Sequence, residues 1–564
     1  MAEKRRKSDV VIIGGVACGP KTAATLARRN TELSITVYQK EKDISYGSCG
    51  LPYFASGDIE SFEALTRTSY GVSRSVDFFQ KSKGFEVVTE AEVMAIDRNQ
   101  KTITIKMLTT DETIIHEYES LVIATGADPV RPPFPCVESP KIRPFTRPAD
   151  ALSFRQLAET GQVGKAVIIG GGFIGCELAE AMGSLWGIET VLVEREKQLL
   201  PYILDPEMAA IAERELARQD VHVITGAAVE KIELDDKDNP VVSIAGHDPV
   251  TADYAFLCLG VRPNTALAKD CGLETGSTGG IIVDKSLKTS DPKIYAGGDC
   301  IESFNRITGA KCYIPMGSLA NRHGRIIAEN INDNPIEFPG VVGSFLVKMF
   351  DLNVGAAGLS EGAAQKAGLK VKSIWGSFGD KPDYYPESNV MTLKLVYDGE
   401  SKRILGLQAA GTGDICRRVD VVSAMLQARA TIDDLLDFEH GYAPPYAEAL
   451  DPLHHLAAMA AAEENGYNFI GPGAILPNGG NIVWLDVRET AEVEAEPWPV
   501  SEGTKTVNIP LNDLRERLDE LDKISDIRLV CKRGPRSYQA AVILRQAGFK
   551  EVRIIAGGYQ AAEL

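Results

Sequence analysis

Residues 166–175 read Ala-Val-Ile-Ile-Gly-Gly-Gly-Phe-Ile-Gly, a short apolar run followed by a complete GxGxxG motif. The apolar run predicts a buried parallel strand, and the glycines predict a tight turn into a helix whose N-terminal amides face a pyrophosphate. The next predicted strand, 190–193, is followed by Glu194, which lies about 20 residues beyond the motif, where the fingerprint places an acid. A carboxylate there binds a ribose diol and repels a 2′-phosphate. This favours NADH, with NADPH as the alternative because Arg195 follows.

A weaker copy of this pattern lies near the start of the chain. Strand 10–13 leads into Gly14-Gly15-Val16-Ala17-Cys18-Gly19, in which valine replaces the usual middle glycine, and then into an alanine-rich helix. The following strand, 34–38, ends beside Gln39 and Glu41, the two candidates for a ribose contact. One such turn alone is also consistent with a simple tight turn. Two in one chain predict that electrons pass between two dinucleotides.

Three later apolar segments, 121–127, 256–260 and 294–299, are predicted to return into these sheets as short strands. The last of them ends at Asp299. A carboxylate at the carboxyl end of a parallel strand can hold sugar or ribityl hydroxyls, although a turn cap is the alternative interpretation. The segment 314–320 is expected to begin a helix whose N-terminus faces the edge of a flavin ring.

Cys49 lies in a bend rich in Gly, Ser and Pro, Ser45-Tyr46-Gly47-Ser48-Cys49-Gly50-Leu51-Pro52-Tyr53. No second cysteine is nearby, so a redox partner for this thiol must be a substrate, a cofactor or a distant part of the chain. The alternative is a buried structural cysteine, a common fate of free cysteine.

The pattern changes after about Gly340. Antiparallel strands are expected at 390–396 and 404–409, helices at 417–428 and 452–464, and a glycine-rich linker at 466–481. Tyrosines stand beside proline at 384–386 and 441–446, which is often simply loop packing.

Cys531 is expected at the end of a strand, before a helix beginning near Tyr538. Three cations follow it within five residues: Lys532, Arg533 and Arg536. Such a field favours the nucleophilic thiolate and would attract an anionic sulfur compound, whereas the alternative is an inert buried cysteine.

Composition bounds the remaining possibilities. The 564 residues suffice for three or four domains, and the net charge of −18 argues against nucleic acid or an anionic membrane surface as partner. We expect no membrane span and no metal site. The ten cysteines are widely spaced without CxxC pairs, which favours a reducing, cytoplasmic location over a disulfide framework.

These motifs together resemble a known family. Residues 9–460 resemble the flavin-dependent pyridine nucleotide–disulfide oxidoreductases, and Ser45-x-x-x-Cys49-Gly50-Leu51-Pro52-Tyr53 resembles their coenzyme A-disulfide reductases. Residues 475–564 resemble a rhodanese domain whose active loop is Cys531-x-x-Gly534-x-Arg536-Ser537. The fusion is similar to coenzyme A-disulfide or persulfide reductases that carry a C-terminal rhodanese module.

The resemblance implies an α/β fold with two Rossmann-like dinucleotide-binding domains, an α+β dimerisation domain and a rhodanese-like α/β domain. The implied bounds are 9–150 with 253–335 for FAD, 151–252 for NAD(H), 336–465 for dimerisation and 475–564 for the rhodanese domain. A homodimer is expected.

The resemblance also assigns roles to residues. FAD would be held by Gly14, Val16, Ala17, Gly19, Gln39, Ala124, Thr125, Gly126, Asp299, Ser318 and Ala320. NAD(P)H would be held by Gly170, Gly172, Phe173, Ile174, Gly175, Glu194 and Gly260. The predicted catalytic residues are Cys49, Cys531, Tyr442, Tyr384, Tyr385 and Arg536. Arg28, Arg29, Ser45 and Ser48 lie where the family contacts coenzyme A.

The implied activity is NAD(P)H- and FAD-dependent reduction of S–S bonds in small disulfides, persulfides or polysulfides, with sulfur relayed from Cys531 towards Cys49. Ser48 replaces the asparagine usual in the reductases and is common in related NADH oxidases and peroxidases, which would cycle Cys49 through a sulfenic acid. Against a peroxidase, Ala17 stands where those enzymes have histidine. The motifs are also compatible with a sulfurtransferase whose flavoprotein part only recycles a carrier, and with a flavin redox sensor without turnover.

Overall fold

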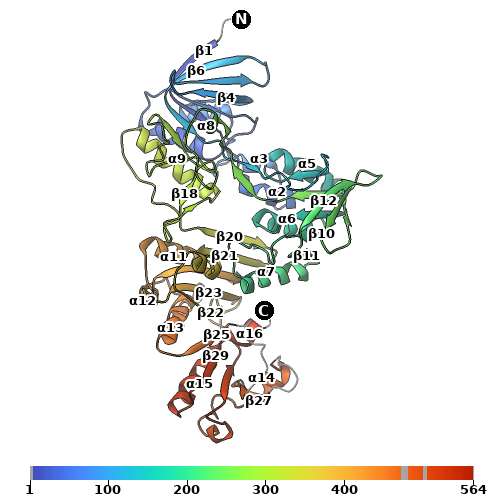
Figure 1. Cartoon of the computed structure of the whole chain (residues 1–564), viewed down its shortest axis with the longest axis vertical. Coiled ribbons are helices and arrows are strands. Elements are labelled where there is room, and N and C mark those ends of the chain that lie inside the picture. Colours follow the sequence, from blue (N-terminus) through green and yellow to red (C-terminus); the bar gives the residue numbers. More distant parts are fainter. Residues whose placement is uncertain (1–3, 472–480, 499–504, 563–564) are drawn as a thin grey trace. The chain divides into compact units, whose positions relative to one another are not determined.

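The computed structural model describes residues 4–471, 481–498 and 505–562 (Figure 1). The chain forms two compact units, one of Met1–Arg195 with Asp220–Val341, and one of Glu196–Gln219 with Val342–Leu564. We call them unit 1 and unit 2. Among the described residues, no helix is long and apolar enough to cross a membrane.

Unit 1 contains two sheets of the Rossmann type, of which the first is mixed, because two antiparallel strands extend its parallel part. The first has the order β3-β2-β1-β6-β5-β4, with β17 on the free side of β6 near its end. Its strands are β1 (Lys4–Ile13), β2 (Ile35–Tyr38), β3 (Glu86–Val88), β4 (Ala91–Asp97), β5 (Thr102–Met107), β6 (Thr113–Ile123) and β17 (Ile294–Ala296). The second sheet, order β11-β10-β9-β15-β8, is parallel throughout. It comprises β8 (Ile142–Pro144), β9 (Lys165–Ile169), β10 (Glu189–Val193), β11 (His222–Ile224) and β15 (Tyr254–Leu257).

The helices of unit 1 cover these sheets and carry most of the predicted site. They include α1 (Cys18–Arg29), α2 (Leu51–Ser56), α5 (Pro148–Glu159), α6 (Phe173–Ser184) and α9 (Gly317–Ile331), and a 3-10 turn spans Ser48–Gly50. Helices α1 and α9 pack closely, because a Cβ at Gly324 would lie 2.6 Å from the Cys18 carbonyl oxygen. Smaller antiparallel pieces are β7 (Ala127–Pro129) with β16 (Val261–Pro263), and β12 (Val229–Leu234), β13 (Pro240–Ile244) and β14 (Val250–Thr251).

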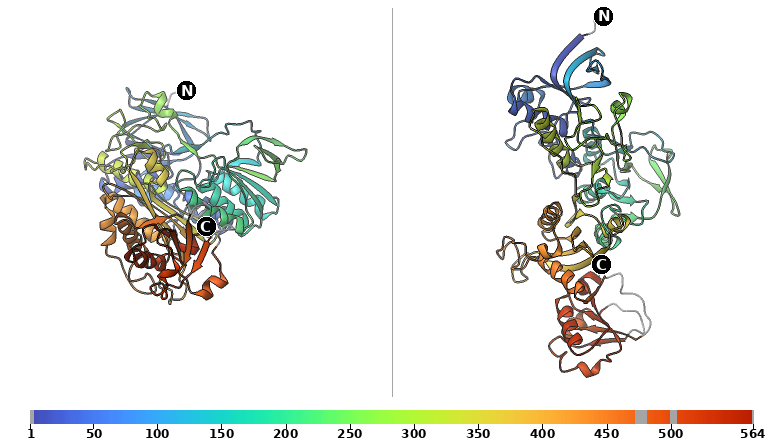
Figure 2. Two further views of the ribbon diagram at one scale, coloured as in Figure 1. Left: turned by 60° about the horizontal axis from the view of Figure 1, so that its bottom comes forward. Right: turned by 60° about the vertical axis from the view of Figure 1, so that its left-hand side comes forward.

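Unit 2 contains an antiparallel sheet and a parallel sheet (Figure 2, yellow to red). The antiparallel sheet has the order β20-β21-β24-β23-β22, with β20 (Ser344–Met349), β21 (Leu352–Gly358), β22 (Val371–Gly379), β23 (Val390–Asp398) and β24 (Ile404–Gly411). Its helices are α7 (Pro206–Arg218), α10 (Glu361–Lys366), α11 (Ile415–Ala428), α12 (Ile432–Leu436) and α13 (Pro452–Glu464).

The C-terminal sheet is parallel, with the order β25-β29-β28-β26-β27. Its strands are β25 (Asn468–Ile470), β26 (Ile482–Asp486), β27 (Lys505–Asn508), β28 (Asp526–Val530) and β29 (Val552–Ile555), with helices α14 (Thr490–Ala495), α15 (Pro535–Gln546) and α16 (Gly558–Ala562). The two Rossmann-like sheets, the antiparallel sheet with its helices and this α/β unit confirm the predicted fold class.

Two local expectations were wrong. Strand β1 begins at Lys4 rather than Val10, since its charged first half pairs with β6 and is balanced by Lys4–Glu112 (2.9 Å) and Lys7–Glu119 (3.4 Å) ion pairs. Part of the expected linker 466–481 is strand β25, which pairs with β29 and belongs to the C-terminal sheet. The rest of that expected linker, from 472 to 480, lies outside the described residues.

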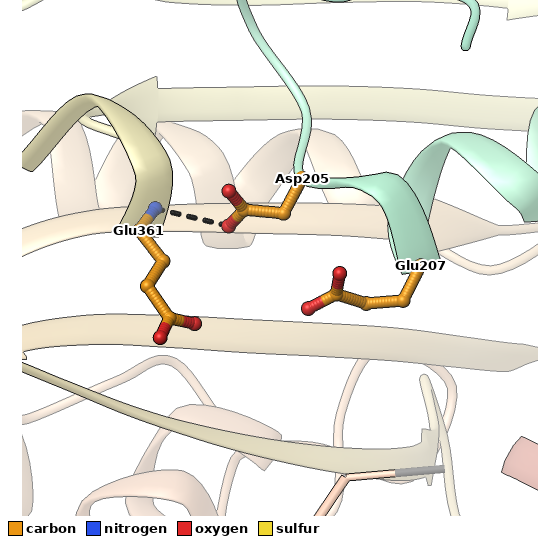
Figure 3. Close-up of side chains that lie close together, drawn as sticks. All are labelled: Asp205, Glu207 and Glu361. Atoms are coloured by element: carbon orange, nitrogen blue, oxygen red, sulfur yellow. Dashed lines mark hydrogen bonds between the residues drawn. The ribbon is translucent and has the colours of Figure 1, made fainter. Parts of the chain in front are cut away.

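A buried ammonium joins α7 to the antiparallel sheet. Lys394 of β23 is 1% exposed, and its Nζ lies 2.9 Å from Asp205 Oδ2 and 2.8 Å from Glu361 Oε2, with Glu207 as a third partner. Burial opposes the charge, but Asp205 and Glu207 outweigh it and raise the pKa of Lys394. Figure 3 shows the three carboxylates and the Glu361 N–H that donates to Asp205 (2.9 Å). Because one ammonium bridges all three acids, the group forms an internal ion cluster.

Replacing Lys394 by methionine should destabilise unit 2 by about 3–5 kcal/mol, because it leaves buried carboxylates without their cation. The matched control is Lys370→Met, which breaks an exposed pair with Glu400 and should cost at most about 1 kcal/mol. Calorimetric unfolding of both variants measures the difference. Equal transition temperatures for the two would contradict this account.

Candidate active site

Two glycine turns in unit 1 have the same geometry. Gly14 follows β1 with φ +112°, and a Cβ there would lie 2.0 Å from the Ala124 carbonyl oxygen. Gly170 follows β9 with φ +111°, and a Cβ there would lie 2.2 Å from the Cys258 carbonyl oxygen. Each position therefore admits only glycine, for both its backbone conformation and its contact with the next strand.

The helices after the two turns start equally close to them. A Cβ at Gly19 or Gly175 would lie 1.9 Å from the carbonyl oxygen of Gly14 or Gly170, respectively. Gly172 has open space where its Cβ would be. The first turns of α1 and α6 are thus brought against the strand ends, with room for a pyrophosphate at their N-termini.

The side chain after the second strand holds each turn in the same way. The Gly15 N–H donates to Gln39 Oε1 (2.7 Å), and the Gly171 N–H donates to Glu194 Oε2 (2.6 Å). Gln39 also donates to Glu41 through Nε2 (2.6 Å). In the N-terminal turn Gln39 therefore accepts the backbone N–H that Glu194 accepts in the second turn. Gln39 also hydrogen-bonds the Glu41 carboxylate beside that N-terminal turn.

Asp299 lies after β17, beside the start of α1. A Cβ at Gly298 would lie 3.2 Å from Cys18 Cβ and 3.7 Å from Ala320 Cβ, so the Asp299 turn, α1 and the first turn of α9 meet here. Burial raises the pKa of Asp299 to about 6, although the Met316 backbone N–H favours the carboxylate. His323 fixes this turn, since its Nδ1 accepts from the Gly298 N–H (3.1 Å).

Other predicted cofactor residues surround this point. The Thr125 hydroxyl donates to the Asn264 carbonyl (2.6 Å), and the Asn264 N–H donates to the Gly126 carbonyl (2.9 Å). These bonds tie the end of β6 to the segment after β16. Residues Val16, Ala17, Phe173, Ile174, Gly260 and Ser318 lie in the same turns, helix starts and strand ends.

Cys49 is solvent-exposed in the 3-10 turn before α2. A Cβ at Gly317 would lie 3.9 Å from Cys49 Sγ, which places the thiol beside the N-terminus of α9 and hence beside the Asp299 cluster. Partial desolvation raises the pKa of Cys49, and the Glu177 carboxyl raises it further. This thiol is consequently less acidic than expected for an activated thiolate, unless a cofactor or substrate changes its surroundings.

Glu177 and Tyr53 were not predicted as site residues. Glu177 lies on α6, two residues beyond Gly175, and the Tyr53 hydroxyl is 3.5 Å from its Oε1. Burial raises the pKa of Glu177 to about 7. The signal in the sequence was an acid one turn inside a dinucleotide-binding helix, where packing normally selects apolar residues.

The predicted coenzyme A contacts each have their own local surroundings. Arg29 pairs with Glu329 of α9 (2.9 Å), and Arg28 donates to Thr25 Oγ1 (3.2 Å). Ser45 has φ +47°, and its carbonyl accepts from Arg74 (2.7 Å). Ser48 begins the 3-10 turn next to Cys49.

Arg322 of α9 was not predicted as a site residue. The pKa of Arg322 is lowered by burial and then by the charges of Arg306 and Arg325. Such positive surroundings favour an anion, and arginine can bind phosphate through two parallel hydrogen bonds.

Cys531 lies just before α15 in unit 2 and is 1% exposed. Its Sγ accepts from the backbone N–H groups of Gly534 (3.0 Å) and Ser537 (3.4 Å). Arg536 pairs with Glu492 of α14 (2.8 Å). This hydrogen bond is the main cause that raises the pKa of Arg536, and the Cys531 sulfur is a smaller one. Arg533 pairs with Asp383. Backbone amides at the helix start therefore hydrogen-bond the Cys531 sulfur, and two of the three predicted cations, Arg533 and Arg536, have carboxylate partners.

The predicted tyrosines lie in loops of unit 2. Tyr384 and Tyr442 are 75% and 51% exposed, and their hydroxyl groups interact electrostatically. Desolvation and then Tyr442 raise the pKa of Tyr384. Tyr385 is only partly exposed. The structure therefore brings Tyr384 and Tyr442 together as an exposed pair of hydroxyls.

Family models match three consecutive parts of the chain. The pyridine nucleotide-disulphide oxidoreductase model matches residues 8–314, its dimerisation domain matches 345–454, and a rhodanese-like domain matches 474–563.

The chain belongs to the pyridine nucleotide-disulphide oxidoreductases.

Known proteins extend this family assignment over the whole chain. A NAD-dependent persulfide reductase from A. fulgidus is 39% identical, with a TM-score of 0.93 over 98% of this chain and 100% of that one. Reduced Bacillus anthracis CoADR-RHD is 32% identical, with a TM-score of 0.90, and the match covers 100% of this chain and 98% of that one. A NAD(P)H sulfur oxidoreductase (CoA-dependent) from Pyrococcus abyssi is 33% identical over 80% of this chain and 98% of its own length.

The family assignment confirms an oxidoreductase that uses FAD and NAD(P)H. The two glycine turns fit these dinucleotides. Both provide a helix N-terminus at a strand end, and the first adds the buried Asp299 carboxyl.

Asp299→Asn should stabilise the flavin-free protein while weakening FAD binding. The folded pKa, about 6, exceeds the ordinary value of 3.8, so this group destabilises the flavin-free fold progressively as pH rises from 3.8 to 6. At pH 7 the penalty removed by asparagine is at most about 3 kcal/mol. The same change removes an anionic acceptor for ribityl hydroxyls. Thermal unfolding of flavin-free protein and FAD titration measure the two effects, with exposed Asp270→Asn as control. Unchanged FAD affinity would contradict the assignment.

Glu177→Gln should lower the pKa of Cys49, because the neutral amide removes a carboxylate that disfavours the thiolate. The pH dependence of Cys49 alkylation should therefore move to lower pH. Glu32→Gln, an exposed change of the same charge in unit 1, should leave the profile in place. An unchanged profile in Glu177→Gln, or a shift to higher pH, would contradict this assignment of the Glu177 charge.

Proposed function

We propose that this flavoprotein reduces S–S bonds of low-molecular-weight persulfides, polysulfides and disulfides with electrons from NAD(P)H, and that coenzyme A carries the sulfur. The observation that supports this most is the pairing of two isolated cysteine sites: Cys49 beside the nucleotide turns and Cys531 in an amide-lined loop. The whole-chain relatives named persulfide reductase and CoADR-RHD support the same substrate class.

The residues proposed to hold FAD are those around Gly14, Gln39, Thr125 and Asp299, and those for NAD(P)H lie around Gly170 and Glu194. Bound FAD would accept a hydride from NAD(P)H and pass its two electrons on to sulfur. The chain places Cys49 at the N-terminus of α9, on the Asp299 side of these turns.

Cys49 is the proposed nucleophile. Its thiolate attacks the carbon-bound sulfur of R–S–SH, forms Cys49–S–S–R and releases HS⁻. Two electrons from NAD(P)H and one proton then break the mixed disulfide, which returns the Cys49 thiolate and RSH. A disulfide R–S–S–R follows the same path with RS⁻ as the leaving group. Glu177, with its pKa of about 7, and Tyr53 are suitable to hold the proton beside this thiol.

Cys531 is the proposed sulfur carrier. Its thiolate takes the outer sulfur of a donor R′–S–SH and becomes a persulfide anion. The rest of the donor leaves as the thiol R′SH. That anion passes the sulfur to a thiol RSH, which restores the Cys531 thiolate and yields the R–S–SH that Cys49 consumes. The two N–H groups donate to Sγ, the atom that bears the charge in the thiolate and bonds the transferred sulfur in the persulfide.

Two further features support coenzyme A as the thiol. The positive surroundings of Arg322 suit its phosphates, and Arg28 on the neighbouring helix α1 is a further proposed contact, whereas Arg29 is already paired with Glu329. The exposed hydroxyls of Tyr384 and Tyr442 suit a leaving thiolate. Because residues 345–454 match a dimerisation domain, we infer that a homodimer brings this tyrosine pair to the partner's Cys49 site.

Two variants test the function. Cys49→Ser should abolish NADH-dependent reduction of both coenzyme A disulfide and inorganic polysulfide, because both reactions need its sulfur. Cys531→Ser should reduce polysulfide turnover much more than disulfide turnover, because only the former uses the relay. Equal retention of both activities by Cys531→Ser would contradict the relay. NADH consumption sustained by O₂ or peroxide alone would indicate an oxidase or peroxidase instead.

A further inference from the structure

The loop that carries Cys531 contacts the antiparallel sheet of its own unit through α16. The backbone N–H groups of Tyr559 and Gln560 donate to the carbonyls of Cys531 (2.8 Å) and Lys532 (3.1 Å). On its other side α16 lies next to β22 (Figure 1), where a Cβ at Gly557 would be 3.2 Å from Ser377 Oγ. We call residues 531–537 the sulfur loop.

Arg533 extends this contact to a second loop. Its Nη1 donates to Asp383 Oδ1 (2.8 Å) and Oδ2 (3.1 Å), while its Nε donates to Gln560 Oε1 (3.1 Å). Gln560 thus orients the guanidinium from within the C-terminal domain. The Arg533 side chain is 27% exposed and that of Asp383 is 71% exposed.

Asp383 directly precedes Tyr384, one member of the tyrosine pair. We call residues 382–386 the tyrosine loop; it contains Tyr384, whose hydroxyl interacts with that of Tyr442. The pKa of the Glu448 carboxyl is raised by burial and then by the charge of Asp383, while Arg533 opposes the rise. Arg533, two residues after Cys531, therefore links the sulfur loop to Asp383 at the start of the tyrosine loop.

We propose that the Arg533–Asp383 ion pair is a positioning latch, which holds the sulfur loop against the tyrosine loop so that sulfur leaving Cys531 reaches a thiol bound beside Tyr384 and Tyr442. This inference rests on the proposed function. Arg533 and Asp383 act by positioning the two loops, and neither residue touches the transferred sulfur. The latch assigns the destination of the sulfur to the tyrosine pair of the same chain.

Asp383→Asn removes the latch while leaving Cys49 and Cys531 in place. Three assays separate its effects: NADH-dependent reduction of coenzyme A disulfide, sulfur transfer from thiosulfate to cyanide with release of sulfite and thiocyanate, and NADH-dependent reduction of inorganic polysulfide with coenzyme A. We expect the first two rates to remain unchanged and the third to fall about two- to fivefold, the effect an exposed ion pair can supply.

Two further variants exclude a general effect of charge or loop packing. Glu387→Gln makes the same charge change at an exposed position four residues further along and should retain all three rates. Asp383→Glu keeps the carboxylate and should recover most of the polysulfide rate. In the wild type the ratio of polysulfide to disulfide rate should fall with rising ionic strength, because exposed ion pairs are screened, whereas in Asp383→Asn it should be flat.

The outcomes distinguish the latch from the function on which it rests. An equal loss in all three assays would indicate disrupted packing and overturn the latch. A normal polysulfide rate in Asp383→Asn, together with a reduced one in Cys531→Ser, would overturn the latch and leave the proposed function intact. A normal polysulfide rate in Cys531→Ser would overturn the relay itself.

Discussion

The close approach of backbone at Gly14 and Gly170 is the constraint on which the rest of unit 1 depends. In each case the turn after a central strand touches the carbonyl at the end of the neighbouring strand, so no side chain fits. The helix that follows is then forced to begin at the sheet edge, because Gly19 and Gly175 contact the same turns. Cofactor sites, Asp299 and the start of α9 are consequences of this placement.

The two reactive cysteines have opposite electrostatic surroundings. Desolvation and the Glu177 carboxyl raise the pKa of Cys49, whereas Cys531 Sγ accepts two backbone N–H groups at a helix start. In the proposed mechanism Cys531 carries sulfur between encounters, and its permanent N–H donors suit that role. The proposed reaction at Cys49 takes place only when electrons and substrate are present and needs no such permanent donors. The proposed division of labour thus agrees with the different surroundings of the two thiols.

Much of this arrangement was predictable from local patterns. The glycine turns, the strand end at Asp299 and the Cys531 loop each combine a residue type with a backbone requirement that few residues satisfy. The N-terminal half of β1 was missed, because its charged residues look solvent-exposed until opposite charges on β6 and its preceding turn are brought alongside. Strand β25 was missed for a related reason. Three residues near glycines are too few to show the alternating pattern of a strand, and only their pairing with β29 identifies them as one.

The site residues that escaped prediction are those whose meaning depends on distant neighbours. Glu177 and Arg322 lie in ordinary helical sequence, and only packing reveals a buried carboxyl beside Cys49 or a guanidinium in positive surroundings. Conversely, the cations after Cys531 suggested a direct effect on the thiol, but Arg536 is paired with Glu492 and Arg533 with Asp383. Charge counted along the sequence overstates the field, since the fold supplies counter-charges.

The exposure of the Arg533–Asp383 pair is consistent with its proposed use. A buried pair would be costly to separate, and would hold the sulfur loop in one position throughout the cycle. An exposed pair contributes little stability and exchanges readily with water, yet it biases the loop towards one orientation. The proposed sulfur transfer uses both properties, because in that proposal Cys531 meets a donor in one step and an acceptor in the next. The short helix α16, bonded to the sulfur loop and packed on β22, keeps such movements small enough for the pair to re-form.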